Sequence, residues 1–247
     1  MKTINLYKYL ISTNNSINDI EVSTISNLLK KIKHSGITTI AGVDGIGKTT
    51  LLRSLALKHA KYNKILYLSA ENYLGADMDY IREMVKQQDI DKRVLKNIVS
   101  TKEPIESLFE LKRIINKAIV SERIDVIYID AINLLYKISP EDIIQRFLEY
   151  IDELSISLNL HFIMSTNLQL GLKNNVGKHV PCTDDIGYYI MNQENDRVIL
   201  LNRQSFWGFS TDKSGNDANG VLSVCIFDQV NNIYNLELRL ENRFGYT

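Results

Sequence analysis

Short apolar runs rich in β-branched residues recur along the chain, and longer segments with a helical spacing of apolar residues lie between them. The runs are almost continuously apolar, as strands covered on both faces of a sheet must be. They occupy residues 37–41, 65–69, 126–130 and 162–166. Apolar positions three and four residues apart predict helices over residues 105–120 and 140–158, the first beginning at Pro104 and the second at Pro140. The pattern predicts an α/β fold in which crossover helices join mostly parallel strands.

The pattern changes after Asn167. A loop rich in Gly, Asn and Lys extends to Asp185, and three segments then alternate apolar and polar residues. These segments are residues 198–201, 221–227 and 233–240. We predict that they form antiparallel strands that extend the same sheet. Residues 1–20 are polar and weakly periodic, so we expect an N-terminal arm or lead-in before one domain over residues 21–247.

The segment after the first apolar run fits the phosphate-binding pattern G-x-x-x-x-G-K-[ST] at every fixed position. It consists of Gly42, Val43, Asp44, Gly45, Ile46, Gly47, Lys48 and Thr49, and Thr50 follows it. Glycines let backbone amides point inward around phosphates, while a lysine and a hydroxyl at this spacing serve the phosphates and a magnesium ion. An apolar stripe predicts that a helix follows, with its positive end toward the anion. The stripe consists of Leu51, Leu52, Leu55 and Ala56. We therefore predict a bound nucleoside triphosphate with Mg²⁺.

Composition limits the remaining choices. The chain has 247 residues, 45% of them hydrophobic, which suits one sizeable domain. Its formal net charge is zero, so any contact with a polyanion must come from a local patch. Cys182 and Cys225 lie far apart without metal-like spacing, which favours a reducing compartment. Because no apolar run approaches the length of a membrane span and no signal peptide is evident, we expect a cytoplasmic protein without membrane contact.

Two acidic residues complete the expected chemistry. Asp130 ends a buried strand, where a carboxylate can face the magnesium ion, although a strand-end aspartate can also cap the following turn. Glu71 follows the strand at residues 65–69, which we expect beside the strand before the phosphate loop. It is the candidate for the base that orients the attacking water, and a solvated glutamate is the alternative.

Several segments resemble the DnaB-like replicative helicases of the RecA-like superfamily. ILYLSAEN at residues 65–72 resembles the family's strand followed by a catalytic glutamate, which is Glu71 here. DVIYIDAINLL at residues 125–135 is similar to its second phosphate motif. LNLHFIMSTNL at residues 158–168 is similar to its sensor strand, with Asn167 where the family usually has Gln. MNQENDRVILLNR at residues 191–203 also resembles the family, so the similarity covers about residues 20–247. The resemblance implies a RecA-like P-loop ATPase with ATP and Mg²⁺ as cofactors.

The chain departs from that family in two ways that bear on activity. Its 247 residues leave no room for the N-terminal primase-contacting domain, so we expect it to correspond to the motor part alone. The family's Lys-x-Arg finger, which reaches a neighbouring subunit's phosphates, would fall at Phe227 and Gln229, and neither is cationic. An arginine finger is worth about a thousandfold or more in other P-loop enzymes. We therefore expect slow hydrolysis unless Arg203, Arg197 or a partner's residue replaces it.

The resemblance also implies nucleic-acid contacts. In the superfamily, loops after the second-motif strand and after the sensor strand line a channel for single-stranded DNA. Here the second loop contains Lys173, Lys178 and His179, whose cations could follow phosphates, although a solvated loop with ordinary lysines is equally compatible. A ring or filament of identical subunits is a further implication, as is contact with other replication proteins.

Two functions follow from these observations. The first is a Mg-dependent ATPase whose hydrolysis is coupled to binding, unwinding or remodelling of single-stranded DNA, with Lys48, Glu71 and Asn167 as catalytic residues and Thr49 and Asp130 as metal ligands. The second is an ATP-binding accessory module, or nucleotide switch, that hydrolyses little. The missing finger favours the second function, and Glu71 favours the first. A small-molecule kinase would need an arginine-rich lid, which the sequence does not contain.

Overall fold

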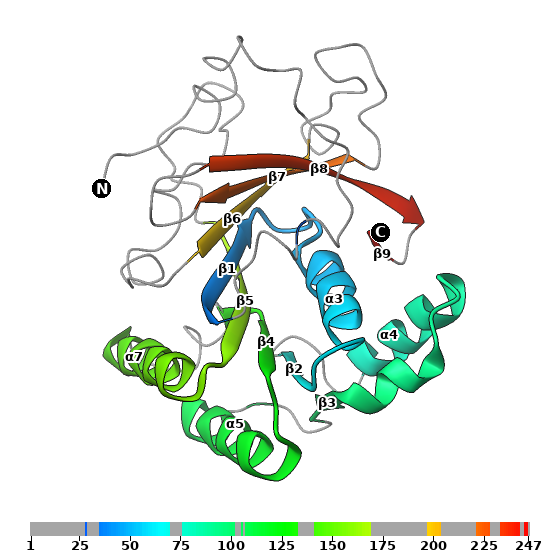
Figure 1. Cartoon of the computed structure of the whole chain (residues 1–247). Helices are drawn as coiled ribbons and strands as arrows, with labels where there is room; N and C mark the ends of the chain where they lie inside the picture. The colour runs from blue at the N-terminus through cyan, green and yellow to red at the C-terminus, as the bar shows by residue number, and fades with distance from the viewer. Residues whose placement is uncertain are drawn as a thin grey trace, which may run out of the picture.

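The computed structural model describes residues 28, 35–69, 76–101, 105, 107–132, 141–168, 197–203, 221–227, 233–242 and 245–246. Within these residues, one nine-stranded sheet runs in the order β3-β2-β4-β5-β1-β6-β7-β8-β9, with helices against its faces (Figure 1). The strands are β1 (Gly36–Gly42), β2 (Ile65–Ser69), β3 (Ile98–Ser100), β4 (Val126–Asp130), β5 (His161–Asn167), β6 (Arg197–Asn202), β7 (Val221–Phe227), β8 (Ile233–Asn242) and β9 (Gly245–Tyr246). The predicted α/β class with mostly parallel strands and an antiparallel C-terminal extension is confirmed.

The strand order corrects one prediction about the site. β2 pairs with β3 and β4, so β4 and β5 separate it from β1. The expectation that the strand at residues 65–69 neighbours the strand before the phosphate loop is therefore wrong. Hydrophobicity identifies a strand that is buried on both faces, but it does not say which strands are its neighbours.

The antiparallel part of the sheet begins one strand later than expected. β6 pairs in parallel with β1, from Thr38 opposite Arg197 to Ala41 opposite Leu200. β7 then pairs antiparallel with β6, and β8 and β9 continue in the same way. β6 is thus the strand at which the parallel and antiparallel parts of the sheet meet, directly beside the strand that leads into the phosphate loop.

The helices form a layer on each face of the sheet. α3 (Lys48–His59) and α4 (Ala76–Gln87) cover one face, and α5 (Leu108–Glu122) and α7 (Glu141–Leu158) cover the other (Figure 1). A 3₁₀ helix, η3 (Lys92–Asn97), precedes β3. α5 begins at Leu108 rather than at Pro104, because the side chain of Ser107 caps it by accepting from the Glu110 amide at 3.1 Å.

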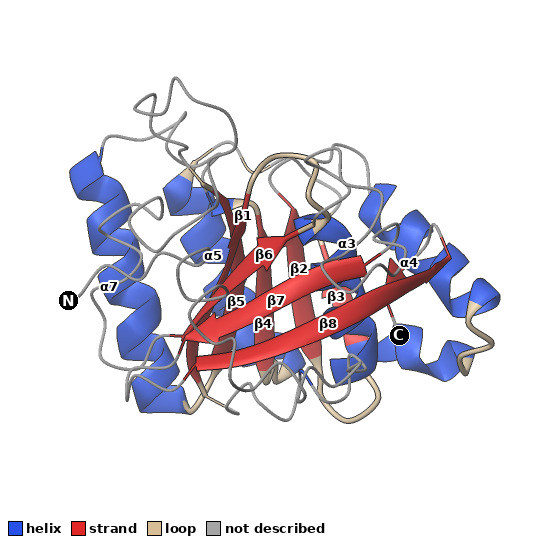
Figure 2. Cartoon of the chain, turned by 90° about the horizontal axis from the view of Figure 1, so that it is seen from above, coloured by secondary structure: helices blue, strands red, loops and turns tan. Residues whose placement is uncertain are grey.

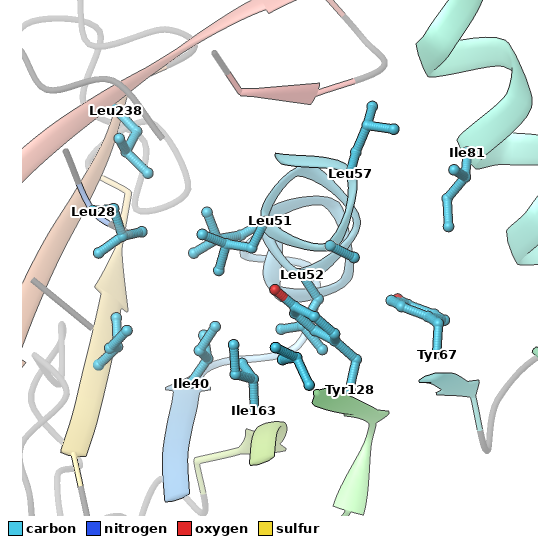
Figure 3. Packing of buried hydrophobic residues seen from close by; sticks show 14 of the residues in the cluster. Leu28, Ile40, Leu51, Leu52, Leu57, Tyr67, Ile81, Tyr128, Ile163 and Leu238 are labelled. Carbon is cyan, nitrogen blue, oxygen red and sulfur yellow. The ribbon is translucent and has the colours of Figure 1, made fainter. Parts of the chain in front are cut away.

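The sheet coils around α3. β7 and β8 pass over the parallel strands, and α3 lies between the two parts of the sheet (Figures 1 and 2). Leu51 and Leu52 therefore share one hydrophobic core with Tyr128 of β4 and with Leu238 of β8 (Figure 3). Arg53, Ser54 and Leu57 are buried as well, so the helix is covered on most of its circumference and not along one stripe alone.

Among the described residues, no helix has the length and apolar character that crossing a membrane would require.

Candidate nucleotide-binding site

The phosphate loop is held between β1 and α3 by two apolar anchors. Val43 and Ile46 are buried in the core beside α3, whereas Asp44 and Gly45 at the tip of the loop are exposed. Gly45 has a φ of 76°, which residues with a side chain rarely adopt. The anchors fix the two ends of the loop and leave its tip open to a ligand.

Gly47 is the residue at which the loop becomes a helix. It occupies the N-cap position of α3 with φ 112° and ψ 20°, and no side chain caps the helix there. The first amides of α3 consequently have no side-chain acceptor at the cap, and the positive end of the helix dipole is directed toward the loop. Both properties favour an anion at this position.

Gly42 is required by close packing. A Cβ atom at this position would lie 2.7 Å from Cγ2 of Ile46 and 3.2 Å from Cβ of Leu201 in β6. The first distance is shorter than any normal carbon–carbon contact, and neither neighbour is the free end of a flexible side chain. The last residue of β1 must therefore be glycine for the loop to turn against β6.

Lys48 folds back onto the loop. Its Nζ donates hydrogen bonds to the carbonyl oxygens of Gly42 at 3.0 Å and Val43 at 2.9 Å, and the residue is 7% exposed. The ammonium group thus lies inside the loop, at the place where phosphate oxygens would compete with the two carbonyls. Exchanging neutral acceptors for charged ones strengthens the hydrogen bonds of a lysine.

Asp130 lies at the end of β4 and is 1% exposed. Its Oδ1 accepts a hydrogen bond of 2.5 Å from Ser165 Oγ, and its Oδ2 accepts one of 3.3 Å from Tyr67 Oη. Side chains alternate between the faces of a strand, and Tyr128, two residues earlier, packs in the core beside α3. Asp130 therefore belongs to the face of the sheet that carries the phosphate loop and its helix. The peptide bond from Asp130 to Ala131 is cis.

Asn167 ends β5 next to the phosphate loop. It is in register with Gly42, and the following amide, that of Leu168, donates to the Gly42 carbonyl at 3.2 Å. Ile163, four residues earlier on the same strand, packs in the core beside α3, so strand alternation puts Asn167 on that face as well. The structure thus brings Asn167, Asp130 and the phosphate loop together at one edge and on one face of the sheet.

The donor set fits a magnesium ion. Mg²⁺ prefers hard oxygen ligands and in nucleotide sites is bound by one or two protein groups together with phosphates. Thr49 supplies a hydroxyl from the second residue of α3, and Asp130 supplies a carboxylate from a nearby strand end. Each carboxylate oxygen has two acceptor positions, so a hydroxyl bonded to one of them is compatible with a cation or its bound water at the other. Thr50 lies in the same first turn, where its carbonyl accepts from Ser54 Oγ.

Other predicted site residues lie outside the described part of the chain. These are the candidate base Glu71, the candidate DNA contacts Lys173, Lys178 and His179, and Gln229 at one finger position.

The structure describes one of the two expected finger positions and both arginines that could replace the missing cation. Phe227 is 8% exposed and packs in the core at the end of β7. Arg197 is buried at the start of β6, opposite Thr38, so four residues, or roughly 13 Å of strand, separate its register position from that of Gly42. This register separates Arg197 from the phosphate loop of its own chain. Arg203 follows the other end of β6. Because β6 runs parallel to β1, this end lies at the same edge of the sheet as the phosphate loop.

Two residues of the site have no counterpart in the sequence prediction. Ser165 and Tyr67 donate to Asp130, yet each lies within a run that the sequence predicts only as a buried strand. The available signal is a hydroxyl-bearing side chain in an otherwise apolar run, because such a group needs a hydrogen-bond partner when it is buried.

Comparison with known proteins agrees with this geometry. A family model described as AAA domain matches residues 30–170, which is more than half of the chain. No curated protein matches the chain significantly in sequence.

Solved structures match over most of the chain at low identity. One that is described as an ATPase domain has a TM-score of 0.67 at 13% identity, covering 98% of this chain and 96% of that one. A DnaB-like replicative helicase, described with its interactions with primase, has a TM-score of 0.67 at 12% identity, covering 98% and 67%. The RadB recombinase has a TM-score of 0.57 at 14% identity, covering 86% and 90%. At these identities the likeness concerns the fold.

The fold is RecA-like, and the phosphate loop is that of P-loop nucleotide-binding domains. The chain belongs to the AAA domain family. Its architecture is that of the ATPase domains of helicases and recombinases.

Proposed function

We propose that this chain binds ATP with Mg²⁺ and hydrolyses it as a motor domain of the DnaB-like kind, and that hydrolysis is coupled to binding or remodelling of single-stranded DNA. One observation carries the proposal. Lys48, Asp130 and Asn167 come from three separate segments, yet they meet at one edge of the sheet and on the face that carries α3. A strand-end carboxylate, a polar sensor and a phosphate loop in this arrangement form the parts of an ATP hydrolysis site.

Each residue has a role that its position supports. Lys48 exchanges the carbonyls of Gly42 and Val43 for β- and γ-phosphate oxygens. Thr49 and Asp130 hold the magnesium ion, directly or through water, and the ion when bound neutralises charge on the phosphates. Asn167 contacts the γ-phosphate or the attacking water from the end of β5.

Glu71 completes the proposed chemistry as the base that orients the attacking water. It lies two residues beyond Ser69, which ends β2 in register with Asp130. The chain therefore leaves β2 at the same edge of the sheet as the other groups, which supports the role that the family resemblance implies for this glutamate.

A steady-state ATPase assay with and without single-stranded DNA tests the proposal. We expect DNA-stimulated hydrolysis by the native chain and loss of hydrolysis with retained ATP binding for Glu71→Gln. Glu149→Gln, on the exposed surface of α7, removes the same charge far from the site and should behave as the native chain does. A native rate at the uncatalysed background, with or without DNA, would overturn the motor proposal.

DNA binding is proposed for the segment after β5, which leaves the sheet beside the phosphate loop. A Lys173→Ala/Lys178→Ala variant should bind a single-stranded oligonucleotide more weakly and with a shallower salt dependence, by roughly 0.7 in log–log slope for each phosphate that the side chains no longer neutralise. Lys92→Ala/Lys117→Ala, with two exposed lysines on η3 and α5, is the matched control. Identical salt slopes for native chain and loop variant would exclude these lysines as phosphate contacts.

An ATP-dependent switch with little hydrolysis is the second candidate. The buried position of Phe227 favours it, because the end of β7 presents an apolar core residue where the related helicases carry a cation. Nucleotide binding together with a background hydrolysis rate would establish this alternative. Sizing with and without a non-hydrolysable ATP analogue tests assembly, and a monomer under both conditions would exclude a ring or filament.

A further inference from the structure

Both carboxylate oxygens of Asp130 are held by buried neutral hydroxyls. Ser165 reaches Oδ1 at 2.5 Å and Tyr67 reaches Oδ2 at 3.3 Å. All three residues are at most 1% exposed. The donors come from β5 and β2, the strands on either side of β4. The carboxylate is consequently fixed from both sides by the sheet itself.

Tyr67 is in turn fixed by a second pair of residues. Its ring stacks on that of Tyr128, with 6.0 Å between the centroids and 23° between the planes. The Tyr128 hydroxyl lies 2.6 Å from Nδ1 of His59, in the last turn of α3. Both rings rise from neighbouring strands toward α3 (Figure 3). The helix that follows the phosphate loop therefore helps to set the position of a group that contacts Asp130.

We propose that Ser165 and Tyr67 are positioning residues that aim the Asp130 carboxylate and thereby set the affinity of the site for its divalent cation. The proposal rests on the proposed function, in which Asp130 faces the cation. A neutral donor orients a carboxylate without bringing a positive charge that would repel the metal. Each hydroxyl occupies one acceptor position of an oxygen, and the oxygen has a second position that can serve the cation or its water.

The geometry also ranks the two residues. The Ser165 contact is the shorter, and the Tyr67 contact, at 3.3 Å, is longer than a usual O–H···O hydrogen bond, so Ser165 should contribute more. Removing a group that orients a metal ligand costs about 10- to 100-fold in metal affinity. We expect a loss of about tenfold or more for Ser165→Ala and a smaller loss for Tyr67→Phe. Ser165→Thr keeps the hydroxyl and should stay close to the native value.

The test uses Mn²⁺ as the probe, with adenylyl imidodiphosphate as a non-hydrolysable nucleotide. Mn²⁺ affinity of the nucleotide-bound chain is measured by electron paramagnetic resonance, and nucleotide affinity is measured separately in the presence of EDTA. Two matched controls lie on the other face of the sheet: Ser155→Ala removes a buried hydroxyl of α7, and Tyr150→Phe removes a hydroxyl that bonds Asn116. Urea unfolding without metal reports whether each variant is folded.

The supporting result is weaker Mn²⁺ binding by Ser165→Ala and Tyr67→Phe, in that order, with unchanged nucleotide affinity in EDTA and recovery in Ser165→Thr. A purely structural role would lower unfolding stability without separating metal affinity from nucleotide affinity. Native Mn²⁺ affinity in both variants would overturn the inference while leaving the proposed function intact. If the native chain itself held neither nucleotide nor Mn²⁺, the proposed function would be wrong and this inference would fall with it.

Discussion

The amide of Leu168 donates a hydrogen bond of 3.2 Å to the carbonyl oxygen of Gly42, and this bond ties the end of β5 to the first residue of the phosphate loop. The bond is made by backbone atoms alone. A substitution of the neighbouring Asn167 side chain therefore leaves it in place, so the function of that side chain can be tested without loosening the loop.

Asn167→Ala should lower kcat for ATP hydrolysis by about tenfold or more, because a polar group next to the phosphate loop contributes mainly when charge develops in the transition state. Nucleotide affinity should change little. Steady-state kinetics and equilibrium binding of a fluorescent ATP analogue measure the two quantities. Unchanged kcat would show that Asn167 does not act as the proposed sensor, and Asn167→Gln tests whether a longer amide is accepted at this position.

Gly42→Ala should disrupt the loop. The added methyl group would lie 2.7 Å from Ile46 and 3.2 Å from Leu201, and such overpacking costs about 1–3 kcal/mol in the free energy of unfolding. Urea unfolding measures this loss, and nucleotide binding should weaken in parallel because the loop must move. In Ile46→Ala the closer contact is absent, so adding Gly42→Ala to that variant should cost less than adding it to the native chain. Equal costs in the two backgrounds would contradict the assigned clash.

Lys48→Ala should affect the free chain as well as the nucleotide complex. The variant loses two hydrogen bonds to the carbonyls of Gly42 and Val43, yet each carbonyl keeps a backbone partner, the amides of Leu168 and Ile46 respectively. The loss in unfolding free energy without nucleotide should therefore be modest, about 1 kcal/mol, while nucleotide affinity should fall sharply. Lys61→Ala is the control, because it removes an exposed lysine that lies just after α3. Native nucleotide affinity in Lys48→Ala would be incompatible with the proposed site.

Cys225 should make stability fall at alkaline pH. Burial raises the pKa of its thiol to about 12, from an ordinary value of 9.0. Between these values the unfolded chain has lost the proton that the folded chain retains, so unfolding free energy decreases by as much as about 1.4 kcal/mol for each pH unit. The contribution is complete below pH 9 and is lost as the pH approaches 12. Tyr128, whose pKa is also raised by burial, acts in the same direction. The difference in pH slope between the native chain and Cys225→Ala isolates the thiol.

The same thiol should resist chemical modification. In a Cys182→Ser background, the thiolate fraction of Cys225 at pH 8 is on the order of a thousandfold lower than for an ordinary cysteine. Labelling with a disulfide reagent should therefore be slow until urea unfolds the chain. Rapid labelling of the folded protein would contradict the burial of this residue.

The phosphate loop and the strand bounds are predictable because both are encoded locally. β2, β4 and β7 match the predicted segments residue for residue, since each is a mostly apolar run that begins directly after a polar residue or a glycine. Lys48 begins α3 where the phosphate motif puts the start of a helix. The sequence analysis does not predict α4, although its buried residues follow a helical period that the sequence contains. These residues are Ile81, Met84 and Val85.

The errors concern features that no local segment contains. The position of β2, with two strands between it and β1, depends on how all the crossovers pack. The burial of Arg53 on α3 depends on α4, because its guanidinium carbon lies 4.5 Å from the centre of the Tyr80 ring. The hydrogen-bond partners of Asp130 also depend on segments that are distant in sequence. Tyr67 and Ser165 lie 63 and 35 residues away in sequence, and only the strand order makes them neighbours.

The meeting of the parallel and antiparallel strands at β6 bears on how far this protein can be shortened. The match to the AAA family ends at residue 170, before β6 begins. A chain cut there would leave β1 as an edge strand with unpaired backbone groups, which invites aggregation, and would remove Leu201 from the side of Gly42. The phosphate loop thus packs against residues inside the family match and against β6, which lies beyond it. We therefore expect residues 30–170 alone to be less stable and more prone to aggregation than the whole chain.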